Sequence, residues 1–243
     1  MLQYIPSYAR FTADHGWLQS RFSFSFAEYQ DPANARFGMM RVFNDDIVQP
    51  GTGFGMHPHA DMEIVTYVID GKLEHKDSLG NKGVIEAGEV QRMTAGSGIY
   101  HSEYNPSAER PVRLLQMWVY PKHKDLTPSW EQKRFTREEQ HGKLLPVISG
   151  GEREGALHIH QDATFYLSTL QAGESVRHTP NGNRRLLLFV IKGTATATVS
   201  DASLEGGEAT QPLTEGDALR LTNAADLVIG TDAAAELLLV DLA

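Results

Sequence analysis

Cysteine is absent from the 243-residue sequence, so disulfide bonds and thiolate chemistry are excluded. No stretch approaches the ~20 consecutive apolar residues of a membrane-spanning helix, and we expect no membrane association. Clusters of lysine and arginine are also missing, and 22 basic against 31 acidic side chains leave a formal net charge of −9. This balance argues against direct nucleic-acid binding. The first thirty residues lack the pattern of a secretory signal, so we expect a cytoplasmic protein.

The composition that is present suits a folded β protein. Hydrophobic residues make up 41% and charged residues 22%, which is enough for a packed core. Short segments rich in valine, isoleucine, leucine and threonine alternate with glycine-containing turns, as at 62–69, 113–120, 184–191, 194–199 and 236–242. Many short strands at close spacing predict an all-β sandwich or barrel. One polar stretch, 130–143, has the composition of a helix, with Thr127-Pro128-Ser129 before it and Gly142 at its end.

The two halves of the chain repeat each other. Residues 50–71 align without a gap on 172–193 at an offset of 122, which places Gly71 on Gly193. A second match, at an offset of 128, places 86–94 on 214–222. A repeat with so long a period predicts two similar domains rather than a solenoid. We predict an N-terminal domain over 1–125, a linker over 126–142 and a C-terminal domain over 143–243.

Histidines form the most informative pattern. Two pairs have the spacing His-x-His: His57 with His59, and His158 with His160. Ten histidines in 243 residues would give roughly 0.4 such pairs by chance, so the spacing alone proves little. The first pair precedes an apolar strand and is followed by a glycine-rich turn and a second polar motif at 101–105. We interpret the second pair as accidental and place it on a surface strand.

The first pair and the second motif could form one site. Residues i and i+2 of a strand point to the same face, so His57 and His59 project together, as do His101 and Glu103. Two facing strands of a small barrel could aim all four side chains at one point. Neutral imidazole and carboxylate groups bind divalent iron, cobalt, nickel, manganese or zinc. The alternative is a solvated polar rim, or a buried cluster held by hydrogen bonds.

The segments GFGMHPHADMEIVTYV (53–68) and TAGSGIYHSEYN (94–105) resemble the two motifs of the cupin superfamily. Together with HGWL (15–18), FSFAEYQDP (24–32), NDD (44–46) and GNKG (80–83), they make the chain similar to the pirin family. Two features depart from the usual cupin pattern: Thr94 replaces a proline, and the loop before His101 is two residues longer. The resemblance implies a bicupin, two double-stranded β-helix (jelly-roll) barrels in tandem. It implies one metal site, in the N-terminal barrel, with the ligands His57, His59, His101 and Glu103.

The repeat adds a statement about the C-terminal domain. At the two offsets, the four candidate ligands are replaced by Thr179, Asn181, Ile229 and Thr231, so we predict no metal there. We expect one divalent transition metal per chain, with iron as the first candidate and nickel, manganese, cobalt, copper or zinc as the others. The histidines without a motif are expected at the surface: His75, His123, His141 and His178.

Some bacterial members of the pirin family resemble quercetin 2,3-dioxygenases, and the resemblance implies this activity here. In that chemistry the metal would bind the 3-hydroxyl group of a flavonol, Glu103 would accept its proton, and dioxygen would open the heterocycle with release of carbon monoxide. We expect a monomer that takes a small aromatic substrate and dioxygen. The alternatives are a non-enzymatic metal- or redox-sensing pirin that binds a regulatory protein partner, and a metal-dependent isomerase.

Overall fold

The computed structural model describes residues 1–201, 204–223 and 226–243, which form two compact units built of β-strands. The N-terminal unit contains Phe11–Phe135 and Leu157–Gln161. The C-terminal unit contains Met1–Arg10, Thr136–Ala156 and Asp162–Ala243. The all-β, two-barrel fold expected from the sequence is confirmed. The domain boundaries placed at 1–125, 126–142 and 143–243 stay a prediction.

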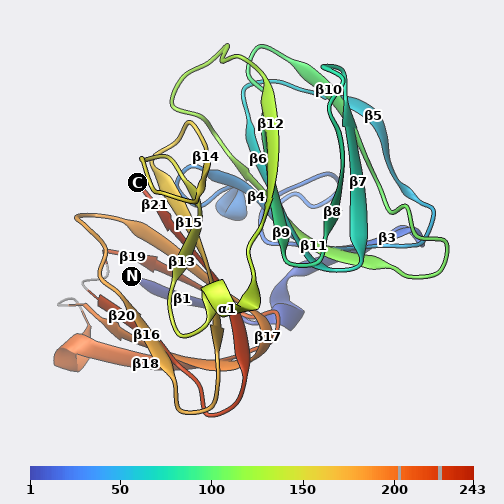
Figure 1. The fold of residues 1–243 in the computed structure, drawn as a ribbon. Coiled ribbons are helices and arrows are strands. Elements are labelled where there is room, and N and C mark those ends of the chain that lie inside the picture. Colours follow the sequence, from blue (N-terminus) through green and yellow to red (C-terminus); the bar gives the residue numbers. More distant parts are fainter. Residues whose placement is uncertain (202–203, 224–225) are drawn as a thin grey trace. The chain divides into compact units, whose positions relative to one another are not determined.

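The N-terminal unit consists of two antiparallel sheets. The strands of these sheets are β2 (Phe11–Asp14), β3 (Leu18–Phe22), β4 (Met40–Val48), β5 (Gly53–His59), β6 (Glu63–Asp70), β7 (Lys72–Asp77), β8 (Lys82–Glu86), β9 (Glu89–Thr94), β10 (Ile99–Tyr104), β11 (Val112–Val119) and β12 (Ser129–Arg134). The short strand β14 (Leu157–His158) also falls in this unit but belongs to neither sheet. The larger sheet has the order β12-β9-β6-β11-β4-β3-β2, and the smaller has the order β5-β10-β7-β8 (Figure 1). A short 3₁₀ turn covers Pro32–Asn34.

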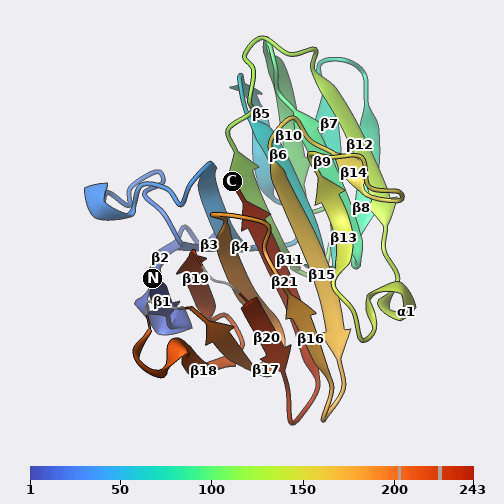
Figure 2. The same cartoon turned by 90° about the vertical axis from the view of Figure 1, so that its left-hand side faces the viewer.

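The C-terminal unit repeats this plan. Its elements are β1 (Leu2–Ile5), the 3₁₀ turn Ser7–Ala9, α1 (Arg137–Gln140), β13 (Leu145–Ser149), β15 (Ala163–Leu170), β16 (Ser175–His178), β17 (Arg185–Ser200), the 3₁₀ turn Glu205–Gly207, β18 (Glu208–Thr214), β19 (Ala218–Thr222), β20 (Asp226–Gly230) and β21 (Ala235–Leu242). The strands β17, β21 and β15 lie side by side, as Figure 2 shows. None of the described helices is long and apolar enough to cross a membrane.

The strand orders of the two units correspond. The row β9-β6-β11-β4 matches β19-β17-β21-β15, and β5-β10-β7-β8 matches β16-β20-β17-β18. The bend in each unit requires glycine at repeat-related positions, Gly71 and Gly193, which both have a φ of +81°. A Cβ atom would lie 2.7 Å from the carbonyl oxygen of Pro111 at Gly71, and 2.0 Å from that of Ala234 at Gly193. Only glycine fits such a left-handed conformation at so close a backbone approach.

The ungapped alignment is wrong at the candidate ligands. Glu103 faces His75 on β7 and Phe54 on β5, and Ile229 faces Ala197 and Val176, which align with those two residues at the offset of 122. Two residues earlier, His101 faces Asp77 and His57, and Leu227 faces Val199 and His178. The structural counterparts of His57, His101 and Glu103 are therefore His178, Leu227 and Ile229, not Thr179, Ile229 and Thr231.

The corrected alignment places one histidine and two aliphatic residues at these three positions of the C-terminal unit. His178 has an acidic partner, because its Nε2 atom lies 2.7 Å from Oδ2 of Asp241. The interior of that unit is filled with aliphatic side chains, among them Val176, Leu188 and Ile229. Among the described residues, both groups of side chains that could hold a metal ion lie in the N-terminal unit.

Two further expectations are wrong. The stretch 130–143 is not one helix, because Ser129–Arg134 pairs with β9 as strand β12 and only Arg137–Gln140 is helical. Trp130 accounts for the difference, since it packs against the hydrophobic clusters of the N-terminal unit. His75 is not a surface residue: it is fully buried and stacks on Trp130 with a ring-centroid distance of 5.0 Å.

Candidate metal centre

Three neighbouring strands of the smaller sheet supply the candidate ligands. In this sheet β10 lies between β5 and β7, and the register places His57 directly opposite His101. The ladder is then interrupted by a bulge, so that Glu103 faces Phe54 on β5. Bulges of this kind re-aim side chains beside active sites. Gly53 allows the close approach of the two strands, because a Cβ atom there would lie 2.2 Å from the backbone oxygen of Glu103.

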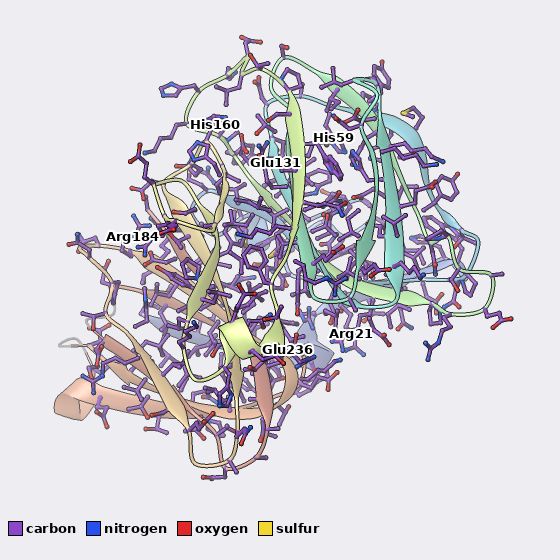
Figure 3. All side chains as sticks on the ribbon, viewed as in Figure 1. Arg21, His59, Glu131, His160, Arg184 and Glu236 are labelled. Atoms are coloured by element: carbon purple, nitrogen blue, oxygen red, sulfur yellow. The ribbon has the colours of Figure 1, made fainter. Side chains whose placement is uncertain are left out.

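The structure brings three of the predicted ligands into one cluster. The ring centroids of His57, His59 and His101 are 4.5 to 4.9 Å apart, and one nitrogen of each lies within 4.8 Å of the others. Figure 3 labels His59 among the side chains of the N-terminal unit. The Nδ1 atom of His57 lies 2.7 Å from the carbonyl oxygen of Gly55. A proton on that nitrogen leaves the Nε2 atom of His57 as a free ligand atom.

The cluster has the properties of a cation site. Nε2 of His59 and both ring nitrogens of His101 are buried and have no hydrogen-bond partner within the described part of the chain. Burial and the neighbouring imidazoles of His101 and His57 lower the pKa of His59 to about 3. Burial and the imidazoles of His57 and His75 lower the pKa of His101 to about 3 as well. Neutral imidazoles with unpartnered nitrogens are the form that ligates a divalent ion, so these residues fit one.

Glu103 lies at the edge of this cluster. It forms a second group of ligating atoms with His101 and His75, within 4.8 Å of one another, so His101 belongs to both groups. The Glu103 side chain is buried, and burial raises its pKa. Its Oε1 atom accepts a hydrogen bond of 2.5 Å from Gln91, and its Oε2 atom accepts one of 2.8 Å from Gln116. The sequence did not predict these partners or the place of His75.

The two glutamine amides are locked in one orientation. The Trp130 indole donates to Oε1 of Gln91 at 2.7 Å, and the Thr66 hydroxyl donates to Oε1 of Gln116 at 2.7 Å. Each amide oxygen is thus used, and each NH₂ group must face Glu103. Glu103 is therefore held as an acceptor in a closed hydrogen-bonded network, which fixes the carboxylate beside His101.

A cavity of about 260 Å³ opens beside the cluster. The residues that line it are Phe26, Asn44, Asp46, Phe54, His57, His59, Ile64, His101, Glu103, Gln116 and Trp118. One part of this lining is aromatic: Trp118 meets Phe26 edge-to-face at 5.4 Å and His59 at 4.8 Å. The cavity has the size and mixed lining of a site for one small aromatic molecule.

Asp46 is a second buried carboxylate in this cavity, and its titration can be tested. Burial raises its pKa from 3.8 to about 7, against the effect of the hydrogen bond that Ser20 donates. Because the pKa of Asp46 is higher in the folded than in the unfolded state, its protonated side chain adds to the free energy of unfolding. This contribution is fully present below pH 4 and is lost as the pH rises through 7. Relative to Asp46→Asn, the metal-free protein should lose up to about 4 kcal/mol of unfolding free energy between pH 4 and pH 8. Urea unfolding at both pH values measures this, and a constant difference between the two proteins would contradict it.

The sequence did not predict the two buried glutamines that hold Glu103. Gln116 and Gln91 stand in apolar strands, and a polar residue at a core-facing position is the signal that could have found them. The NDD segment contributes Asn44 and Asp46 to the interior, and Asp45 points the other way to pair with Arg113. Thr94, which departs from the cupin pattern, donates to Oε2 of Glu63 at 2.9 Å.

Comparison with known proteins agrees with this architecture. The family model "Pirin" matches residues 6–119, and the model "Quercetinase C-terminal cupin domain" matches residues 146–242. A protein named quercetin 2,3-dioxygenase from Escherichia coli (strain K12) is 43% identical over 230 residues, covering 95% of this chain and 94% of its own. A pirin-like protein from Caulobacter vibrioides is 47% identical over 182 residues, covering 74% of this chain and 78% of its own.

A solved structure is similar over the whole chain. The bacterial pirin YhhW from Escherichia coli, in complex with nickel(II), has a TM-score of 0.89 and 40% identity, with 100% of this chain and 99% of that chain covered. Two jelly-roll barrels, one with a cluster of three imidazoles, place the protein among the bicupins. With both family models matched and relatives of this identity, the chain belongs to the pirin family.

Proposed function

We propose that the protein is a metal-dependent dioxygenase that opens the heterocycle of a flavonol such as quercetin, with its metal site in the N-terminal barrel. The observation that carries the proposal is the cluster of His57, His59 and His101 beside an aromatic-lined cavity. The names of the relatives, quercetin 2,3-dioxygenase among them, support the same reaction class. Iron stays the metal expected from the sequence, and the nickel(II) complex of the bacterial pirin supports a divalent ion.

Each ligand has a defined role in this proposal. His57, His59 and His101 would hold the ion through neutral ring nitrogens, and Glu103 would complete the set or stand beside it. When bound, the ion would act as a Lewis acid that makes a coordinated hydroxyl group easier to deprotonate and provides a place for dioxygen. Glu103 groups with His101 and His75 and not with His57 and His59, which favours a carboxylate that acts as a base beside the ion rather than as one of its ligands.

The protein's own side chains would then bind the substrate and move one proton. Phe26, Phe54 and Trp118 would pack against the rings of the flavonol and exclude water from the cavity. Glu103 would accept the proton of the 3-hydroxyl group, and its raised pKa makes it a stronger base than an exposed glutamate. Gln91 and Gln116 would keep the carboxylate in place during the transfer.

Oxygen uptake tests this function. Protein loaded separately with iron, nickel, manganese or cobalt is mixed with quercetin in a closed oxygen electrode, and carbon monoxide is measured in the headspace. The proposal expects uptake of one dioxygen for each carbon monoxide released, with at least one metal. Absence of uptake with all four metals would favour the alternative of a metal-sensing pirin that binds a regulatory protein. The cytoplasmic location and the monomeric state stay predictions.

A further inference from the structure

The strand register sorts the interior of the larger sheet into rows that cross the strands. The row nearest the aromatic part of the cavity contains Val42, Trp118, Ile64 and Met93. The next row contains Phe22, Asn44, Gln116, Thr66 and Gln91, and the third contains Ser20, Asp46, Leu114 and Val68. Side chains directly opposite each other on antiparallel strands share a face, so each row is a line of neighbours. The middle row is polar over four adjacent strands: Asn44 on β4, Gln116 on β11, Thr66 on β6 and Gln91 on β9.

The residue at one end of this polar row, Asn44, differs from the others in its hydrogen bonding. Gln91, Thr66 and Gln116 bond to one another or to Glu103, as described above. Asn44, the next residue along the row, is 4% exposed, and its Oδ1 atom is buried with no hydrogen-bond partner among residues 1–201, 204–223 and 226–243. Leaving a buried acceptor unpaired costs free energy, and such a group in a cavity lining indicates that a ligand supplies the missing partner. Because the amide can turn about its terminal bond, it can offer either its oxygen or its NH₂ group.

Asp46 extends this polar end by one row. Residues i and i+2 of β4 point to the same face, and both Asn44 and Asp46 line the cavity. The Oδ1 atom of Asp46 accepts from Ser20, and this is the one hydrogen bond that its carboxylate makes with the residues that the structure describes. Asn44 and Asp46 together therefore offer one amide and one carboxylate oxygen to a bound molecule.

We propose that Asn44 and Asp46 form a subsite that binds a second hydroxyl group of the substrate, at the end of the molecule that the metal ligands do not hold. The histidines belong to β5 and β10 of the smaller sheet, and the subsite belongs to β4 of the larger sheet. The aromatic side chains of Phe26, Phe54 and Trp118 line the same cavity. This inference rests on the proposed function, because it assumes that the cavity takes an aromatic substrate.

The lining also defines the substrate class. A hydroxyl group can donate to Asp46 and accept from the Asn44 amide, so it satisfies both residues at once. A carboxylate or phosphate group would meet the two acidic side chains of Asp46 and Glu103 in the same cavity and would be rejected. The subsite therefore selects a neutral, planar aromatic molecule that carries hydroxyl groups at two separate positions.

Matched flavonols test the subsite without turnover. Binding to nickel-loaded protein is measured by calorimetry under nitrogen, with 3-hydroxyflavone, 3,7-dihydroxyflavone and 3,4′-dihydroxyflavone as probes. We expect one of the two dihydroxy compounds to bind at least ~10-fold more tightly than 3-hydroxyflavone. Its second hydroxyl group would form a hydrogen bond with the buried Asn44 amide, which 3-hydroxyflavone leaves without a partner. In Asn44→Leu, which keeps the size of the side chain, this gain should fall below ~2-fold. Asn181→Leu, at an exposed position of the C-terminal unit, is the control and should keep the gain.

Each outcome decides the proposal. Equal binding of all three probes to the parent protein, or a gain that survives in Asn44→Leu, would overturn it. If thermal melting shows that Asn44→Leu does not fold, Asp46→Asn takes its place, since it keeps the shape and removes the charged acceptor. A gain that is unchanged in Asp46→Asn would then reject the subsite. A protein that shows the expected gain but consumes no oxygen would reject the dioxygenase function and retain the subsite.

Discussion

The double variant His57→Ala/His59→Ala should bind no stoichiometric metal, whereas the parent protein should bind one ion per chain. Removing both side chains leaves His101 as the one imidazole of the first group. Loss of a residue that only orients a ligand typically weakens metal binding ~10–100-fold, so loss of two ligands should exceed ~100-fold. Elemental analysis of protein dialysed against a slight excess of metal gives the stoichiometry. The strands and both cores remain, so circular dichroism should be unchanged.

The second His-x-His pair provides a matched control. His158→Ala/His160→Ala removes the same two side chains at the same spacing from the same unit, outside both candidate metal groups. This variant should keep the full complement of metal. Metal retained by His57→Ala/His59→Ala, or two ions in the parent protein, would contradict the assigned ligand set.

The fold was predictable because its determinants are local. Glycine at positions 71 and 193 marks the same bend in both repeats, and apolar runs between glycine turns mark the strands. The stretch 130–143 was not predictable in the same way, because its conformation depends on a partner strand far away in the sequence. Pairing of Ser129–Arg134 with β9 and burial of Trp130 outweigh the helical preference of the segment.

The site was predictable where ligand types stand at strand spacing. His57, His59 and His101 were found in this way, because their chemistry is specific and i, i+2 residues share a face. Glutamine and asparagine are common on surfaces, so the sequence could not distinguish the buried Gln91, Gln116 and Asn44 from solvated side chains. Their function depends on which strands pair. The sequence of a single segment does not determine its pairing with a strand that is distant in the chain.

Replacement of Glu103 should have the second large effect. We expect Glu103→Gln, saturated with metal, to lose at least ~100-fold in oxygen uptake with quercetin, since general bases contribute about that much or more. The single variant also disturbs the hydrogen bonds, because its new NH₂ group would face a glutamine NH₂ group that Trp130 or Thr66 holds in place. A loss of activity by this variant alone could therefore reflect a disturbed barrel.

The exchange Glu103→Gln/Gln116→Glu separates the two causes. In it, the carboxylate at 116 accepts from the Thr66 hydroxyl and from the new amide at 103, whose oxygen accepts from Gln91, so every donor again has an acceptor. The exchanged protein has the composition and charge of the parent protein, and its melting temperature should return to within a few degrees of the parental value. The carboxylate, however, no longer lies beside His101. We expect the exchanged protein to fold and bind metal but to remain at least ~100-fold slower. Oxygen uptake at the parental rate in either variant would remove Glu103 from the mechanism.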